Sequence, residues 1–153
     1  MARAEIDVAA PPERVFEVLL DPRYYGHWVM GAREIRGWDD DWPAIGSRFH
    51  HTQGKPPFTI KDHSVLEDMD PPHKFTLLAK ARPAGTFRVT LHLSPNATGT
   101  HITMIEDPGD RFTRLVAGPL THLAIRGRNE VSLRRLKDIA EGRGPSPEDA
   151  RRP

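Results

Sequence analysis

The chain has 153 residues, of which 37% are hydrophobic and 28% are charged, a composition that suits one globular domain and excludes a disordered chain. Its 22 Lys and Arg residues balance 21 Asp and Glu residues. The chain therefore has no large overall positive charge that would attract nucleic acid. We do not expect nucleic acid as a partner. The absence of cysteine excludes disulfides, thiolate catalysis and cysteine-rich zinc sites.

No segment approaches the roughly 20 apolar residues that a membrane span needs. Residues 1–13, MARAEIDVAAPPE, lack the apolar stretch of a signal peptide. These observations predict a cytoplasmic protein without a membrane span.

The first elements are a strand and two short helices. Residues 4–10 place Ile6 and Val8 on one face, as a strand does. Residues 11–21, PPERVFEVLLD, have apolar residues near helical spacing, and Pro12 suits a first helical turn. The Asp21–Pro22 step ends that helix, because a residue before proline avoids helical geometry. Residues 22–31 predict a second short helix with an aromatic side.

Six further short segments follow, each bounded by Gly, Pro, Asn or Asp, which is typical of an antiparallel meander. They are residues 32–38, 47–54, 58–69, 74–82, 85–94 and 99–107. From about Arg111 the apolar residues follow helical spacing to about Glu141, and we expect Pro119 to kink this helix or delay its start. This order predicts an α+β fold in which an antiparallel sheet curls around one long C-terminal helix.

Three histidines lie close together in FHHTQGKPPFTIKDH, residues 49–63. His50 and His51 are adjacent in a predicted strand, so they point to opposite faces. His63 can lie across from only one of them. Two imidazoles without a third ligand make a poor catalytic metal site, and we expect no metal.

The opening segment resembles that of a known superfamily. APPERVFEVLLDPRYYGHWV is similar to the start of the START-related SRPBCC proteins, which include polyketide cyclases, lipid-transfer domains and birch-pollen-allergen-like proteins. The residues that carry this likeness are Ala10, Val15, Phe16, Leu19, Asp21 and Trp28.

Later segments extend the resemblance over roughly residues 3–142. They are the Gly-opened hairpin that leads to the Asp70-Pro71-Pro72 turn, the strand GTHITMIED, and RGRNEVSLRRLKDIAE, which is similar to the closing helix of bacterial polyketide cyclase/dehydrase-like members. The resemblance implies a helix-grip fold: a curved seven-stranded antiparallel sheet around a long C-terminal helix, with two short helices after the first strand and a cavity between sheet and helix. It implies one domain, 1–142, followed by a flexible tail, 143–153.

Alternation along the strands predicts the cavity lining. In residues 85–94, one face carries Phe87, Val89 and Leu91, and the opposite face, with Arg88 and His92, should be wet. Trp28 is expected mainly as a structural plug that could also touch a ligand. The expected ligand-binding residues are Trp28, Phe49, Phe58, Ile60, Leu77, Phe87, Val89, Leu91, Ile102, Met104 and Leu123.

Five titratable residues are candidates for acid–base chemistry: His51, His63, Glu106, His122 and Arg126. Glu106 shares a face with Met104, where apolar walls would raise the pKa of its carboxyl group; the alternative is a glutamate paired with an arginine of the helix. His51 should share an inward side with Phe49, and either Asp62 or His63 must point inward. His122 and Arg126 share a helix stripe that faces either the cavity or solvent.

Three functions remain open. The first is binding of a hydrophobic or aromatic small molecule in the cavity. The second is a polyketide cyclase/dehydrase-type enzyme that uses acid–base groups in the same cavity. The third is an interaction protein without a ligand that acts through its basic helix end. A homodimer is also open, and no cofactor is expected.

Overall fold

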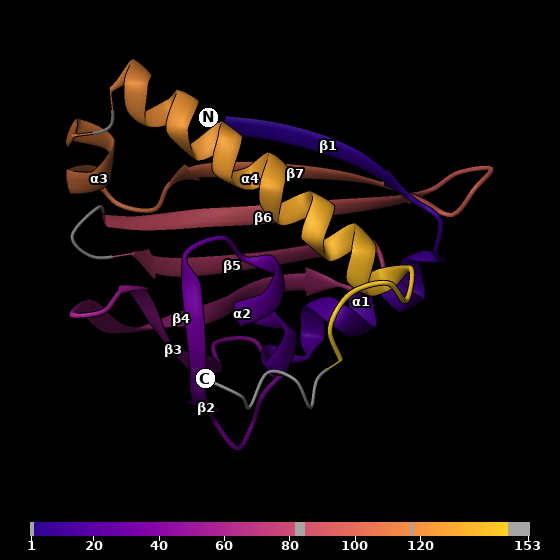
Figure 1. The fold of residues 1–153 in the computed structure, drawn as a ribbon, viewed down its shortest axis with the longest axis horizontal. Helices are drawn as coiled ribbons and strands as arrows, with labels where there is room; N and C mark the ends of the chain where they lie inside the picture. The colour runs from indigo at the N-terminus through magenta and orange to yellow at the C-terminus, as the bar shows by residue number, and fades with distance from the viewer. Residues whose placement is uncertain (1, 82–84, 117, 147–153) are drawn as a thin grey trace.

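The computed structural model describes residues 2–81, 85–116 and 118–146 of the chain. In this part, seven strands form one antiparallel sheet in the order β1-β7-β6-β5-β4-β3-β2, and α4 crosses in front of it (Figure 1). The meander and the α+β fold predicted from the sequence are confirmed. The strands are β1 (Ala2–Val8), β2 (Ala32–Trp38), β3 (Arg48–Lys55), β4 (Phe58–Asp70), β5 (Lys74–Ala81), β6 (Gly85–Pro95) and β7 (Thr100–Pro108).

The segment between β1 and β2 is helical, as expected. It contains α1 (Pro12–Leu20), the short 3-10 helix η1 (Pro22–Tyr24) and α2 (Tyr25–Trp28). Pro12 occupies the first turn of α1, and the Asp21 carboxylate accepts a hydrogen bond from the Arg23 backbone N–H at 3.0 Å. Asp21 therefore both ends α1 and begins η1.

The C-terminal helical region is divided in two. The sequence predicted one helix from about Arg111, with Pro119 as a disturbance. The structure has α3 (Arg111–Val116) and then α4 (Pro119–Ala140), with Pro119 in the first turn of α4. Proline fits a first turn because the N–H that it lacks has no helical acceptor there. Pro119 thus starts the long helix instead of kinking it.

Only the second half of α4 packs into the molecule. Its buried residues are Asn129, Ser132, Leu133, Leu136, Ile139 and Ala140. Leu120 and Leu123, in the first two turns, are largely exposed. The helix is anchored through contacts with β1, α1 and α2.

The face of the sheet turned toward the helices carries the core. Phe87, Val89, Leu91 and Leu93 are buried along β6, as predicted. On the opposite face, Arg88 pairs with Glu67 at 2.7 Å. In β7, Ile102, Met104 and Glu106 are buried in the same way. The alternation that the sequence indicated is therefore the alternation of the sheet.

The predicted flexible tail began at residue 143, and residues 147–153 lie outside the described residues. Within the described part, the chain after α4 turns back, and the Gly144 backbone N–H donates to the carbonyl of Asp138 at 3.0 Å. In the same part of the chain, no helix has the length and apolar character needed to cross a bilayer.

Candidate functional site

A small cavity lies between the sheet and the second half of α4. Its apolar walls come from α2, β5, β6 and β7 and include Trp28, Leu77, Phe87, Val89 and Met104. The cavity measures about 40 Å³, which is room for roughly three water molecules. A larger molecule can enter only if part of the wall moves outward.

One side of this cavity is polar. The Arg128 guanidinium of α4 donates to Glu106 Oε1 of β7 at 2.6 Å. The Glu106 side chain is only 1% exposed, whereas that of Arg128 is 34% exposed. Because the arginine lies partly outside and the carboxylate inside, the ion pair spans the cavity wall.

Two polar atoms beside this ion pair have no partner. Within the described part of the chain, neither Glu106 Oε2 nor Asn129 Nδ2 makes a hydrogen bond. Both residues line the cavity, and both are buried. Buried polar groups are almost always paired in folded proteins. A free acceptor and a free donor in one cavity wall are therefore suited to a ligand that offers both.

The outer part of the cavity is built from more flexible groups. Met30, Gln53 and Lys80 contribute to its lining, and the Met30 side chain is 43% exposed. The Met30 backbone N–H donates to Ser132 Oγ of α4 at 3.0 Å. This bond ties the segment after α2 to the helix, so movement of α4 would also move Met30.

A second polar group lies deeper under the sheet. His51 Nε2 and Ser64 Oγ are 3.1 Å apart on neighbouring strands, and the Tyr25 ring lies against the His51 ring, with their centroids 5.3 Å apart. Tyr25 also lines the cavity. The three side chains form a continuous connection, Tyr25–His51–Ser64, from the cavity into the sheet.

Burial sets the protonation of this connection. It lowers the pKa of His51 to about 4, only partly opposed by the nearby Asp62 carboxylate, and it raises the pKa of Tyr25. At neutral pH, His51 is therefore an uncharged imidazole and Tyr25 a protonated phenol. His51 Nδ1 has no partner among the described residues.

The predicted ligand-binding residues divide into three groups. Trp28, Leu77, Phe87, Val89 and Met104 line the cavity. Phe49, Leu91 and Ile102 are buried in the core outside the lining, and Ile60 is half-buried. The placement of Phe58 and Leu123 in a cavity wall was wrong, since they are 86% and 67% exposed.

These two corrections have different causes. Phe58 begins β4 directly after the Pro56–Pro57 turn, so it lies on the inward face but beyond the part of the sheet that is covered. Leu123 lies in the first half of α4, where the helix has no buried residues.

Of the five titratable candidates, only Glu106 lines the cavity. His51 points inward, as expected, and does not line the cavity itself but contacts Tyr25, which does. The inward residue of the next strand is Asp62, not His63. His122 is half-buried, and Arg126 is exposed and pairs with Glu130 at 3.4 Å. Of the alternatives that the sequence left open, the structure therefore has Asp62 inward instead of His63, and His122 and Arg126 outside the cavity lining.

Arg128 and Ser132 were missed from the sequence. An arginine partner for Glu106 was one alternative, but nothing in the sequence distinguished Arg128 from the other arginines of the helix. A strand residue gives no information about which helical turn lies opposite it.

The three histidines of residues 49–63 are separated by the sheet. His50 pairs in register with His63, and their rings lie 6.3 Å apart on the outer face. His51 lies on the inner face. No group of three potential metal ligands occurs among the residues that the structure describes.

Comparison with known proteins agrees with this architecture. Residues 2–141 match the family described as "Polyketide cyclase / dehydrase and lipid transport". The chain belongs to this family. No curated protein sequence matches the chain.

Solved structures show the fold of this family member. The chain is similar to Ara h 8.0201, with a TM-score of 0.70 at 9% identity, over 90% of this chain and 95% of that one. For protein MLL2253 from Mesorhizobium loti it is 0.67 at 20% identity, over 90% of this chain and 94% of that one.

A third structure, TTHA0849 from Thermus thermophilus, is similar with a TM-score of 0.65 at 16% identity, over 91% of this chain and 95% of that one. These likenesses confirm the helix-grip fold. The family and the fold suggest binding of hydrophobic ligands, and they lend no support to a homodimer.

Proposed function

We propose that this family member binds a small, mostly apolar molecule that carries a hydroxyl group. The free atoms Glu106 Oε2 and Asn129 Nδ2 are the observation that carries the proposal. A hydroxyl can donate to the carboxylate and accept from the amide at the same time. The apolar walls around Trp28 and Met104 would hold the rest of the ligand.

The size of the cavity adds a condition. A ring compound of ten or so heavy atoms exceeds about 40 Å³, so binding requires Met30 and the first half of α4 to move outward. The turns of α4 that precede Arg128 have no buried side chain to hold them in place, which makes such a movement inexpensive.

Displacement of the apolar dye N-phenyl-1-naphthylamine by 2-naphthol and by naphthalene tests the proposal. The two ligands differ only in the hydroxyl. Leaving the two buried partners unpaired costs about 1–3 kcal/mol, so 2-naphthol should displace the dye at a roughly tenfold lower concentration. Equal displacement by both compounds would refute the role of the polar wall.

Variants locate the effect. Asn129→Leu and Glu106→Gln should reduce the preference for 2-naphthol. Glu130→Gln makes the same chemical change on the outer side of α4, where Glu130 pairs with the exposed Arg126, and should leave the preference unchanged. If the wild type shows no saturable binding of the dye, an interaction protein without a ligand is favoured instead.

A second candidate function is acid–base catalysis of ring closure. The Tyr25–His51–Ser64 connection favours it, because a protonated phenol in the cavity wall lies against a neutral imidazole. Such a group can protonate a carbonyl oxygen during an aldol closure followed by loss of water. With a linear aryl triketone as substrate, Tyr25→Phe should lower the rate of cyclisation and leave dye binding intact. An unchanged rate would remove this candidate.

A further inference from the structure

Two consecutive helices expose a group of large apolar side chains. Phe112, Leu115 and Val116 of α3 are 65%, 84% and 53% exposed, and Leu120 and Leu123 of α4 are 83% and 67% exposed. We call these five residues the α3–α4 apolar patch. Single exposed apolar residues are ordinary, whereas five within twelve positions on adjoining helices indicate a contact surface.

The charges within the same segment are of one sign. Between residues 111 and 129, every charged side chain is an arginine: Arg111, Arg114, Arg126 and Arg128. Directly before them, Asp110 accepts a hydrogen bond from the Thr113 backbone N–H at 2.7 Å, and directly after them Glu130 pairs with Arg126 at 3.4 Å. Arginines beside exposed leucine and phenylalanine are the composition of a helix that lies in the plane of an anionic membrane surface.

The patch lies at the end of the sheet where the cavity is lined by Phe87 and Lys80. Thr113 of α3 accepts a hydrogen bond from the Thr86 backbone N–H at 2.9 Å, one residue before Phe87. Figure 1 shows α3 beside the end of β6, and α3 contacts β6 and β7. A surface that holds α3 and the first half of α4 would therefore lie next to the wall that has to move.

We infer that α3 and the first half of α4 dock this protein onto an anionic lipid membrane. The apolar patch enters the boundary between headgroups and acyl chains, and Arg111 and Arg114 contact lipid phosphates. The inference rests on exposure and charge, so it holds whether or not the cavity binds a hydroxylated ligand.

A second copy of the chain is a poorer occupant of this surface. A two-fold dimer brings the same patch of both copies together. Arg111 and Arg114 of one copy would then approach the same arginines of the other, and the nearest acidic residue in the sequence, Asp110, already accepts a hydrogen bond from the Thr113 backbone N–H. An anionic membrane supplies that neutralisation.

Co-sedimentation with lipid vesicles tests the inference. The protein should pellet with vesicles of phosphatidylcholine mixed with phosphatidylglycerol, and much less with vesicles of phosphatidylcholine alone. Raising the salt from about 0.1 M to about 1 M shortens the screening length from about 10 Å to about 3 Å, which should release most of the protein. Equal binding to both vesicle types, or none to either, would overturn the inference.

Surface variants assign the contact. Leu115→Asp combined with Leu120→Asp should weaken binding roughly tenfold or more. Arg111→Gln and Arg114→Gln should each weaken it about fivefold. Ile45→Asp is the matched control: Ile45 is 56% exposed and follows Asp39, Asp40 and Asp41, so vesicle binding should not change.

Each variant should keep the far-ultraviolet circular dichroism of the wild type, because the altered side chains are exposed. Binding that survives Leu115→Asp with Leu120→Asp would overturn the inference. The inference would also be overturned if the wild type did not bind vesicles and instead formed a concentration-dependent dimer, seen by sedimentation velocity, that this double variant abolishes.

Discussion

Arg128 of α4 and Glu106 of β7 form an ion pair of 2.6 Å that joins the helix to the sheet across the wall of the cavity. The carboxylate is buried and the guanidinium is one-third exposed. Because Arg128 uses only Glu106 Oε1 in this contact, Oε2 is left free within the cavity. One oxygen of this carboxylate thus joins the helix to the sheet, and the other has no hydrogen-bond partner among the described residues.

Removal of the arginine should destabilise the protein strongly. Arg128→Met leaves the buried Glu106 carboxylate without its counter-charge, which should lower the free energy of unfolding by about 3 kcal/mol. Glu106→Gln removes the charge and should cost less, and the double variant should recover part of the loss of Arg128→Met. Urea unfolding of the four proteins measures the coupling. A coupling close to zero would mean that the pair contributes nothing to stability.

The His51 imidazole should make the protein lose stability in mild acid. Its pKa is about 4 in the folded protein and 6.5 ordinarily. The unfolded chain therefore binds the proton first, so the His51 contribution is complete above pH 6.5 and is lost as the pH falls toward 4, by up to about 3 kcal/mol.

The matched measurement is the unfolding free energy of the wild type and of His51→Gln between pH 4 and pH 7. The difference between them should change steadily across this range, because glutamine does not titrate. His92→Gln, which removes an exposed histidine of β6, is a control for the loss of a histidine from the sheet. A parallel pH dependence for wild type and His51→Gln would contradict the burial of a neutral imidazole.

Alternation along the strands allowed the inward faces to be predicted. The buried positions of β6 and β7, from Phe87 to Leu93 and from Thr100 to Glu106, follow the period of two that a half-covered sheet imposes. Alternation gives the face and not the distance along it. Phe58 has the parity of Asp62 and Ser64 but lies beyond the covered part of the sheet.

The face of α4 could not be predicted for a physical reason. Its apolar residues do not form one stripe, since Leu120 and Leu123 belong to an exposed surface and Leu133 and Leu136 to the core. A helix with two different neighbours along its length has no single amphipathic pattern. For the same reason, nothing in the sequence indicated that Arg128, rather than Arg126, would meet Glu106.

Gly85 should be required for the position of α3. It has a φ of +123°, a conformation that glycine adopts readily and other residues do not. A Cβ there would also collide with the Thr113 side chain, which accepts the hydrogen bond from Thr86 N–H. Gly85→Ala should therefore lower the free energy of unfolding by about 1–3 kcal/mol.

Gly127→Ala is the matched control for this substitution. Gly127 lies within α4, where an added Cβ meets nothing within 4 Å. Alanine favours a helix over glycine by roughly 0.5–1 kcal/mol, so this variant should be more stable than the wild type. Thermal unfolding compares the two. A Gly85→Ala protein as stable as the wild type would show that α3 can shift without loss.

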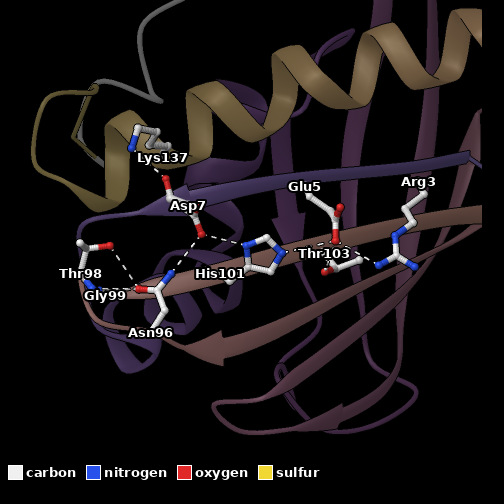
Figure 2. A network of polar contacts seen from close by, with 9 residues as sticks. All are labelled: Arg3, Glu5, Asp7, Asn96, Thr98, Gly99, His101, Thr103 and Lys137. Carbon is white, nitrogen blue, oxygen red and sulfur yellow. Dashed lines mark hydrogen bonds and ion pairs between the residues drawn. The ribbon is translucent and has the colours of Figure 1, made fainter.

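The surface histidine His101 should titrate in the opposite sense to His51. Figure 2 shows it between two carboxylates of β1: its Nδ1 lies 2.8 Å from Asp7 and its Nε2 lies 3.3 Å from Glu5. Hydrogen bonds to Asp7 and then Glu5 raise the pKa of His101 above its ordinary 6.5. The stability that this contact adds is therefore present below pH 6.5 and is lost as the pH rises through the folded pKa.

The imidazole resonances of His101, followed by NMR, should give the higher pKa in the wild type and a lower one in Asp7→Asn. Asp68→Asn removes a carboxylate that pairs with Lys74 elsewhere and should leave the pKa of His101 unchanged. Because the His51 effect lies below pH 6.5 and the His101 effect above it, one pH series of unfolding measurements resolves the two, and an unshifted His101 titration in Asp7→Asn would refute the pairing.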